Sequence, residues 1–211
     1  TFRKEKIKNK RGLQKELGLS QDDKKFMIGI VSRLTDQKGF DLIDYVIEEI
    51  CAEDTQLVVL GTGEEKYENL FRHFAWKYPD RVSANIYYSN ERSHKIYAAC
   101  DAFLMPSLFE PCGLSQLMSL RYGTVPIVRE TGGLKDTVQP YNMFENTGNG
   151  FTFDRYESGL LYDAINRAKT LYFENRKSWD DMVIRDMDKD VSWEKSAKQY
   201  KDMYVGLTPR D

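Results

Sequence analysis

The hydrophobic and polar positions of the chain follow two patterns that alternate along the sequence, one typical of strands and one typical of helices. Short apolar runs such as FMIGIV and LVVL are typical of buried strands, whereas FDLIDYVIEEIC repeats its apolar residues at helical spacing. The pattern predicts strands over residues 25–34, 55–61, 81–88, 101–107, 124–130 and 148–154, and helices over residues 40–51, 64–78, 93–100, 112–123, 157–173, 179–190 and 192–207. Strands that alternate with helices require crossover connections, which build a parallel sheet. We therefore expect an α/β protein with a doubly wound, mostly parallel sheet.

The composition agrees with such a fold and narrows the classes of partner. A chain of 211 residues with 41% hydrophobic side chains can bury a full core in one large domain or two small ones. The apolar runs are far shorter than a membrane span, and 31 basic against 33 acidic side chains leave a net charge of -2, so we expect neither a membrane nor nucleic acid as a partner. Three cysteines without a C-x-x-C spacing indicate reduced thiols in a cytoplasm and no metal site. The basic run TFRKEKIKNKRG has no strand before it, which favours a chain that continues from a longer protein.

The residues that follow each strand are the first candidates for a site, because ligands of parallel α/β sheets bind beyond the carboxyl ends of the strands. The first strand is followed by SRLTDQKG, which lacks the G-x-G-x-x-G pattern of dinucleotide sites. It places Arg33 and Lys38 at the start of a helix, where anions are favoured, although a solvated surface loop explains the same two cations as well. After the second strand, Gly61 and Gly63 are more typical of a tight turn than of a phosphate loop.

The segment SLFEPCGLSQLMSLRYGTVPIVRETGG, residues 107–133, combines an acidic residue with two sets of backbone donors. Pro106 and Pro111 stiffen the backbone around Glu110, and Gly113 allows a helix to begin with its amide groups exposed. Amide and hydroxyl donors suited to a phosphate come from Leu114, Ser115, Thr131, Gly132 and Gly133.

The carboxylate of Glu110 points to a second kind of ligand group. A carboxylate repels phosphate but accepts hydrogen bonds from hydroxyl groups, each worth about 1.5–3 kcal/mol. Two cations for a diphosphate, amides for its oxygens and a carboxylate for a polyol together predict a nucleotide-sugar site. A helix-capping role for Glu110 remains the alternative.

Four blocks of the sequence resemble a known family. RLTDQKGFDLI, GTGEEKYE, SHKIYAACDAFLMPSLFEPCGLSQLMSLRYGTVPIVRETGGLKDTV and GNGFTF are similar to the C-terminal half of bacterial glycogen synthases and plant starch synthases, which are retaining glucosyltransferases of the GT-B fold. The resemblance implies that residues 1–211 form a single Rossmann-like domain, the C-terminal half of a two-domain enzyme. It implies transfer of glucose from ADP-glucose to the non-reducing end of an α-1,4-glucan, with retention, without a metal or cofactor, in a bacterial cytoplasm or a plastid.

The resemblance also implies roles for individual residues. Arg33 and Lys38 bind the diphosphate and, with Glu110 beside the donor glucose, take part in catalysis by stabilising charge during a front-face displacement. Tyr88 stacks on the adenine, with Tyr87 as the alternative. The other implied contacts are backbone contacts of Cys112, Gly113 and Leu114 to sugar and phosphate, and phosphate contacts of Ser115, Thr131, Gly132 and Gly133.

Two features depart from the wider pattern of retaining transferases. The second Glu of their E-x7-E pattern is replaced by Met118, as it is in glycogen and starch synthases. The N-terminal domain, with its K-x-G-G motif and most of the acceptor surface, is not in the chain, so we expect the isolated chain to be inactive and the helices from about residue 174 to pack toward that domain. A non-catalytic nucleotide- or glucan-binding module of the same fold is the alternative, and His94 and the Cys112 thiol are expected to be structural rather than catalytic.

Overall fold

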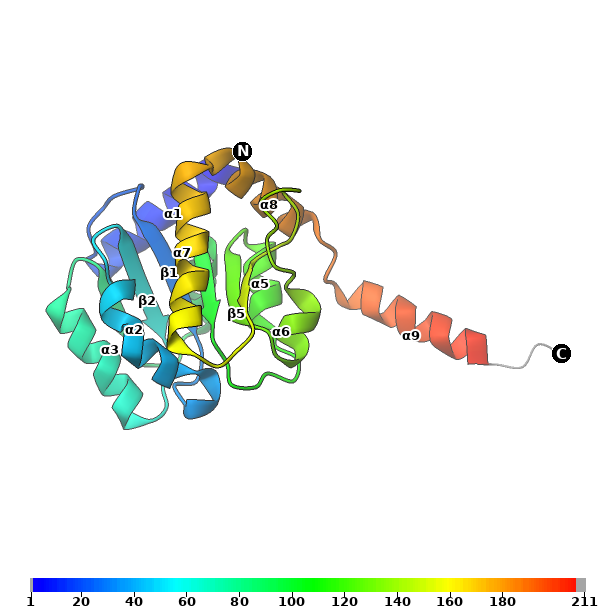
Figure 1. The fold of residues 1–211 in the computed structure, drawn as a ribbon, viewed down its shortest axis with the longest axis horizontal. Coiled ribbons are helices and arrows are strands. Elements are labelled where there is room, and N and C mark those ends of the chain that lie inside the picture. Colours follow the sequence, from blue (N-terminus) through cyan, green and yellow to red (C-terminus); the bar gives the residue numbers. More distant parts are fainter. Residues whose placement is uncertain (1, 208–211) are drawn as a thin grey trace.

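Six parallel strands form a sheet in the computed structural model, which describes residues 2–207 (Figure 1). The strands are β1 (Phe26–Val31), β2 (Thr55–Leu60), β3 (Val82–Asn85), β4 (Ala102–Met105), β5 (Val125–Arg129) and β6 (Phe151–Phe153). Their order is β3-β2-β1-β4-β5-β6, so the direction of winding reverses between β1 and β4. The expected doubly wound sheet is confirmed, and all of its strand pairs are parallel. Residue 1 and residues 208–211, at the two ends of the expected 1–211 domain, lie outside the described residues.

Helices cover both faces of the sheet (Figure 1). They are α1 (Phe2–Leu17), the 3-10 helix η1 (Asp36–Lys38), α2 (Phe40–Ile50), α3 (Glu65–Lys77), α4 (Asn90–Ala99), α5 (Ser115–Arg121), α6 (Gly132–Thr137), α7 (Ser158–Glu174), α8 (Arg176–Asp188) and α9 (Trp193–Leu207). Helices α2, α3 and α7 pack with one face of the sheet, and α1 and α4 pack with the other.

The central strand β1 shows why its sequence is apolar throughout. Phe26 and Ile28 point into the core beneath α2 and α7, whereas Met27 points into the core beneath α1 and α4. Because both faces of the strand are buried, neither face carries the polar residues that an exposed sheet would show.

Among the elements that differ from the sequence-based expectation are β3 and α6. The strand predicted over residues 81–88 ends at Asn85, because β3 is the edge of the sheet and the chain turns there toward α4. The short helix α6 was not predicted, since it begins with two glycines, which are poor helix formers.

The last two helices behave differently from one another. Helix α8 buries Trp179, Met182 and Val183 in the core that the sheet shares with α7. Helix α9 has no buried residue among those described, and it projects away from the sheet (Figure 1). Its Trp193 is 81% exposed. Helix α8 therefore packs against this body, and the segment that leaves it begins after α8.

Candidate functional site

A cavity of about 350 Å³ lies where the winding of the sheet reverses, beyond the carboxyl ends of β1 and β4. This is where doubly wound sheets bind their ligands. Of the residues expected to contact the donor, the structure brings six into its lining: Arg33, Lys38, Glu110, Gly113, Leu114 and Ser115. They come from two chain segments that are more than seventy residues apart and meet only because β1 and β4 are neighbours.

Lys38 and Glu110 form an ion pair in the wall of this cavity. The Lys38 Nζ atom lies 2.5 Å from Glu110 Oε2, and the two side chains are only 17% and 10% exposed. Ser107 Oγ donates a further, longer hydrogen bond of 3.4 Å to the same oxygen. The close approach depends on Gly39, whose φ of 77° is left-handed and whose position leaves no room for a Cβ beside the Pro106 carbonyl.

The helix-capping alternative for Glu110 does not agree with this geometry. Helix α5 begins after Leu114 without a side-chain cap, and the Glu110 carboxylate faces Lys38 instead. A largely buried carboxylate that is paired with a lysine in a cavity is placed to contact whatever enters that cavity.

A second cavity of about 240 Å³ adjoins the first. The two share Val31, Ser32 and Arg33, so Arg33 stands at their junction. Tyr87 and Tyr88 both line the second cavity. Tyr88 is 90% exposed, whereas the Tyr87 hydroxyl donates to Asn85 Oδ1 at 3.1 Å and fixes that ring.

The loops that carry Arg33 and Lys38 are tied to the neighbouring loop after β2. The Leu34 amide donates to the Thr62 carbonyl at 2.9 Å, and a Cβ on Gly63 would lie only 2.1 Å from the Leu34 carbonyl oxygen. Gly63 therefore serves a tight backbone contact, as the turn interpretation predicted. Lys66 lies 2.6 Å from Asp36 and holds the pKa of that carboxyl below its usual value.

The Thr-Gly-Gly turn after β5 supports the Glu110 loop from outside the cavity. The Gly133 amide donates to the Glu110 carbonyl at 3.0 Å, and Cβ atoms on Gly132 and Gly133 would collide with the Glu110 and Cys112 carbonyls. The Thr131 amide is also engaged, by the Arg129 carbonyl at 2.9 Å. These three residues do not line the cavity. Cys112 is not in the lining either; it is exposed, and its thiol lies 3.7 Å from the Gly113 carbonyl oxygen.

Arg129, at the end of β5, is a residue that the sequence analysis overlooked. Its guanidinium donates to the Ser107 carbonyl at 2.9 Å, to the Leu108 carbonyl, and to the Asp154 carbonyl at 3.3 Å. It thereby holds the backbone from which Glu110 projects. Its position at the carboxyl end of a strand, directly before the Glu-Thr-Gly-Gly turn, was the available signal.

Other residues considered in the sequence lie elsewhere. His94 is on α4, where its Nδ1 atom is 2.8 Å from the Tyr122 hydroxyl, in agreement with a structural role. Met118 is 44% exposed on α5. Among residues 2–207, no group of three or more His, Cys, Asp or Glu side chains is arranged to hold a metal ion, and no helix is long and apolar enough to span a bilayer.

Residues 14–183 match the sequence family described as Glycosyl transferases group 1. The chain belongs to this family. The six-stranded parallel sheet with helices on both faces is the Rossmann-like half of the GT-B glycosyltransferase fold.

Relatives within the group 1 transferases include bacterial glycogen synthases. The glycogen synthase of Lachnoclostridium phytofermentans is 68% identical over 206 residues, which cover 98% of this chain and 43% of that protein. The glycogen synthase of Clostridium acetobutylicum is 52% identical over 202 residues, with 96% and 42% covered. The chain therefore spans less than half the length of these relatives.

Solved structures show the same relation. The catalytic domain of starch synthase IV from Arabidopsis thaliana, bound to ADP and acarbose, superposes with a TM-score of 0.87 at 37% identity, covering 95% of this chain and 42% of that one. HepE of Anabaena in complex with UDP-glucose superposes with a TM-score of 0.71 at 19% identity, covering 95% and 53%, which is a likeness of fold.

Proposed function

We propose that this chain is the donor-nucleotide half of a glycogen or starch synthase, which transfers glucose from ADP-glucose to the non-reducing end of an α-1,4-glucan with retention. The observation that carries the proposal is the pair of adjoining cavities at the winding reversal, with Arg33 at their junction and the Lys38–Glu110 pair in the larger one. The identity to glycogen synthases and the likeness to a starch synthase bound to ADP and acarbose support it.

The two cavities suit the two ends of a nucleotide sugar. The smaller cavity offers the ring of Tyr88 for stacking on adenine, and Arg33 lies where a diphosphate joining the cavities would pass. The larger cavity receives the glucose beside Glu110, with Gly113 allowing its backbone to approach and the first amides of α5 near the phosphate. Cys112 and Leu114 complete this loop. The 131–133 turn holds the loop in place through the hydrogen bond from the Gly133 amide to the Glu110 carbonyl.

The ion pair of Lys38 with Glu110 provides one charged partner for each end of the donor. Donor binding brings a diphosphate that competes for the Lys38 ammonium, and it brings hydroxyl groups that donate to the Glu110 carboxylate in its place. As the glycosidic bond to the diphosphate breaks, negative charge grows on the leaving oxygens. Arg33 and Lys38 therefore stabilise the transition state more than the ground state.

The complete reaction requires a second wall for this cleft. The chain spans 43% of the length of its glycogen synthase relatives, and in our proposal the remainder forms the opposite side of the cleft and binds the glucan. Residues 1–211 then act as one nucleotide-sugar-binding domain. The complete enzyme works in a bacterial cytoplasm. The isolated chain binds the donor but does not transfer glucose.

The test compares Lys38→Ala and Glu110→Ala for ADP binding by isothermal titration calorimetry. Lys38→Ala is expected to weaken ADP by about 1.5–3 kcal/mol, the range for a hydrogen bond to a charged group. Glu110→Ala is expected to leave ADP affinity unchanged or stronger, because ADP carries no glucose and Lys38 is released from its partner. In the full-length enzyme, Glu110→Ala is expected to remove most of the turnover.

Two controls separate binding from folding. Lys38→Ala leaves a buried carboxylate without its lysine, so circular dichroism must show a folded protein and the Lys38→Ala/Glu110→Ala double variant supplies a charge-balanced comparison. Lys135→Ala removes an exposed lysine from the same edge of the sheet and is expected to bind ADP normally. If Glu110→Ala weakens ADP as much as Lys38→Ala does, Glu110 only supports the loop and the proposed site is wrong. Binding of maltooligosaccharide without ADP would favour the glucan-binding module.

A further inference from the structure

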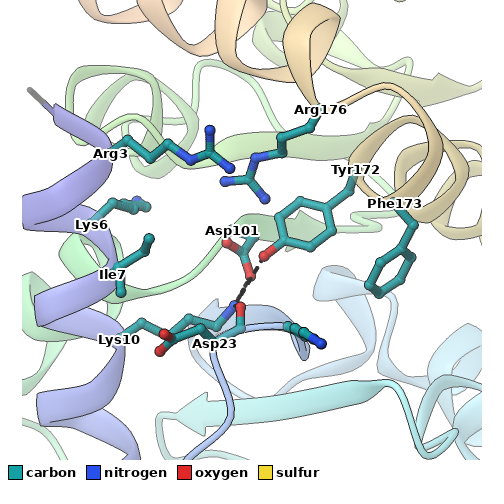
Figure 2. A pocket seen from close by; sticks show the side chains of 10 residues that line it. Arg3, Lys6, Ile7, Lys10, Asp23, Asp101, Tyr172, Phe173 and Arg176 are labelled. Carbon is teal, nitrogen blue, oxygen red and sulfur yellow. Dashed lines mark hydrogen bonds and ion pairs between the residues drawn. The ribbon is translucent and has the colours of Figure 1, made fainter.

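A separate cavity, lined by charged side chains, lies at the other end of the strands, at the amino ends of β1 and β4 (Figure 2). Its volume is about 350 Å³, and its walls come from α1, the loop before β1, the residue before β4 and the junction of α7 with α8. Four cationic side chains (Arg3, Lys10, Lys24 and Arg176) and two carboxylates (Asp23 and Asp101) line it. Lys6 also lines it, but burial lowers the pKa of Lys6 to about 7, and its Nζ donates to the Tyr97 and Tyr122 carbonyls. None of these residues belongs to the candidate donor site.

Both carboxylates of this lining are already paired. Asp101 Oδ2 accepts from Lys10 Nζ at 2.6 Å and from the Met27 amide at 2.8 Å, and the two charged side chains are almost fully buried. Asp23 accepts two hydrogen bonds from Arg11, which is outside the lining. The negative charge at the floor of the cavity is therefore neutralised within the protein.

The rim of this cavity, formed by Arg3, Lys24 and Arg176, carries more positive charge than the one carboxylate paired with it neutralises. The guanidinium groups of Arg3 and Arg176 share one carboxylate, Asp180, with Arg3 Nη1 at 3.4 Å from Oδ2 and Arg176 Nε at 3.0 Å from Oδ1. Figure 2 shows these two guanidinium groups pointing toward each other across the opening. Lys24 is an exposed cation at the same rim. Bringing two guanidinium groups together with one carboxylate leaves a site that favours a further anion.

The cationic rim is held by rigid and partly apolar surroundings. Arg176 stacks on the ring of Tyr172, with 4.3 Å from its Cζ atom to the ring centroid, and the Tyr172 hydroxyl lies 3.2 Å from Lys10 Nζ. Phe173, which is 44% exposed, and Ile7 form an apolar part of the lining. A stacked guanidinium loses little freedom when it binds a ligand, which favours affinity.

We propose that this cavity binds a small phosphate-bearing molecule, with its phosphate between Arg3 and Arg176 and its remaining part against Phe173. Guanidinium groups present parallel N–H donors that match phosphate oxygens, and two of them from separate helices form a clamp. A ligand here would contact both the start of α1 and the start of α8, at the end of the strands opposite to the donor site.

The experiment uses inorganic pyrophosphate as the probe and backbone amide chemical shifts of the 211-residue chain as the readout. Pyrophosphate is expected to shift the amides of Ile7, Phe173 and Arg176, and separately those of residues 113–115 in the donor site. Arg3→Gln and Arg176→Gln are each expected to weaken the pyrophosphate affinity obtained from Ile7, Phe173 and Arg176 at least tenfold. The affinity obtained from residues 113–115 is expected to stay unchanged. Arg3 is 53% exposed, so its replacement does not threaten the fold if the Arg176 variant proves unstable.

A matched variant separates a built site from general attraction to a basic helix. Lys8→Gln removes one positive charge from the same helix, at a side chain that is 79% exposed and outside this cavity, and it is expected to leave both responses unchanged. The proposal is overturned if pyrophosphate produces no shift at Ile7, Phe173 and Arg176, if Arg3→Gln binds as the unmodified chain does, or if Lys8→Gln weakens binding equally. Loss of the donor-site response alone would count against the proposed function and not against this site.

Discussion

Asp186 on α8 is buried in a way that makes the stability of the chain depend on pH. Its side chain is 2% exposed, and neither carboxylate oxygen has a hydrogen-bond partner among residues 2–207. Burial raises the pKa of Asp186 from 3.8 to about 8, and the nearby cations Arg185 and Lys189 offset this only in part. The folded protein therefore keeps Asp186 protonated near neutral pH.

The sign and size of the effect follow from this raised pKa. Above pH 3.8 the unfolded chain releases the proton of Asp186 while the folded chain retains it up to about pH 8. Over this range the free energy of unfolding falls as the pH rises, by about 1.4 kcal/mol per unit. The full contribution is present below pH 3.8, and the penalty reaches about 4 kcal/mol near pH 7.

The perturbation is Asp186→Asn, which keeps the shape and cannot ionise. The measurement is urea unfolding of both proteins at pH 5 and pH 7. Between these two values the unmodified chain is expected to lose about 3 kcal/mol more stability than the variant. Taking the difference between two pH values cancels any constant cost of burying the amide. Asp188→Asn, an exposed position on the same helix, provides the control and is expected to follow the unmodified chain.

Parallel pH profiles for the unmodified chain and Asp186→Asn would refute the reasoning. They would mean that Asp186 ionises in the folded state as it does in the unfolded state. The carboxylate would then have a partner or a path to solvent that the described packing of α8 does not provide.

Three further predictions concern the candidate site. Tyr88→Ala is expected to weaken ADP by about 1–3 kcal/mol through loss of base stacking, as measured by calorimetry, with Tyr87→Phe as the comparison; equal affinities would remove the stacking role. Arg129→Gln is expected to lower the turnover of the full-length enzyme by about tenfold to a hundredfold and to change ADP affinity in the isolated chain little, because Arg129 holds the Glu110 backbone and lines neither cavity. A parallel loss of ADP affinity would contradict this role. The isolated chain is expected to incorporate no glucose from ADP-glucose into glucan above a no-protein control, and incorporation would show that one wall of the cleft suffices.

Local patterns in the sequence were sufficient for most of the elements. The apolar runs and the helical spacing depend on neighbours within one turn or one strand, so the six strands and most helices could be predicted from them. Helix α6 was not predicted because its two glycines are typical of a turn. Tertiary contacts with the Glu110 loop stabilise this helix in place of local helix propensity. The same limit explains why the Thr-Gly-Gly glycines were interpreted only as donors to phosphate.

The composition of the candidate site was also visible in the sequence, because ligands of a parallel sheet collect after the strands. Arg33, Lys38 and Glu110 could be selected on that ground before any contact was known. The sequence did not show that Lys38 and Glu110 bind each other, since their 72-residue separation is closed only by the pairing of β1 with β4.

The sequence by itself thus determined the alternation of elements, the winding of the sheet and the residue types at its carboxyl edge, because these depend on local periodicity and on general rules of chain connection. The tertiary structure alone decided which charges meet. Lys10 and Asp101, 91 residues apart, come together at the amino edge, and Arg3 and Arg176 face each other across a cavity that no local motif announces. The physical reason is that an ion pair or a cavity requires positions in space, and the packing of α1 and α8 around the sheet fixes those positions only after the whole core has formed.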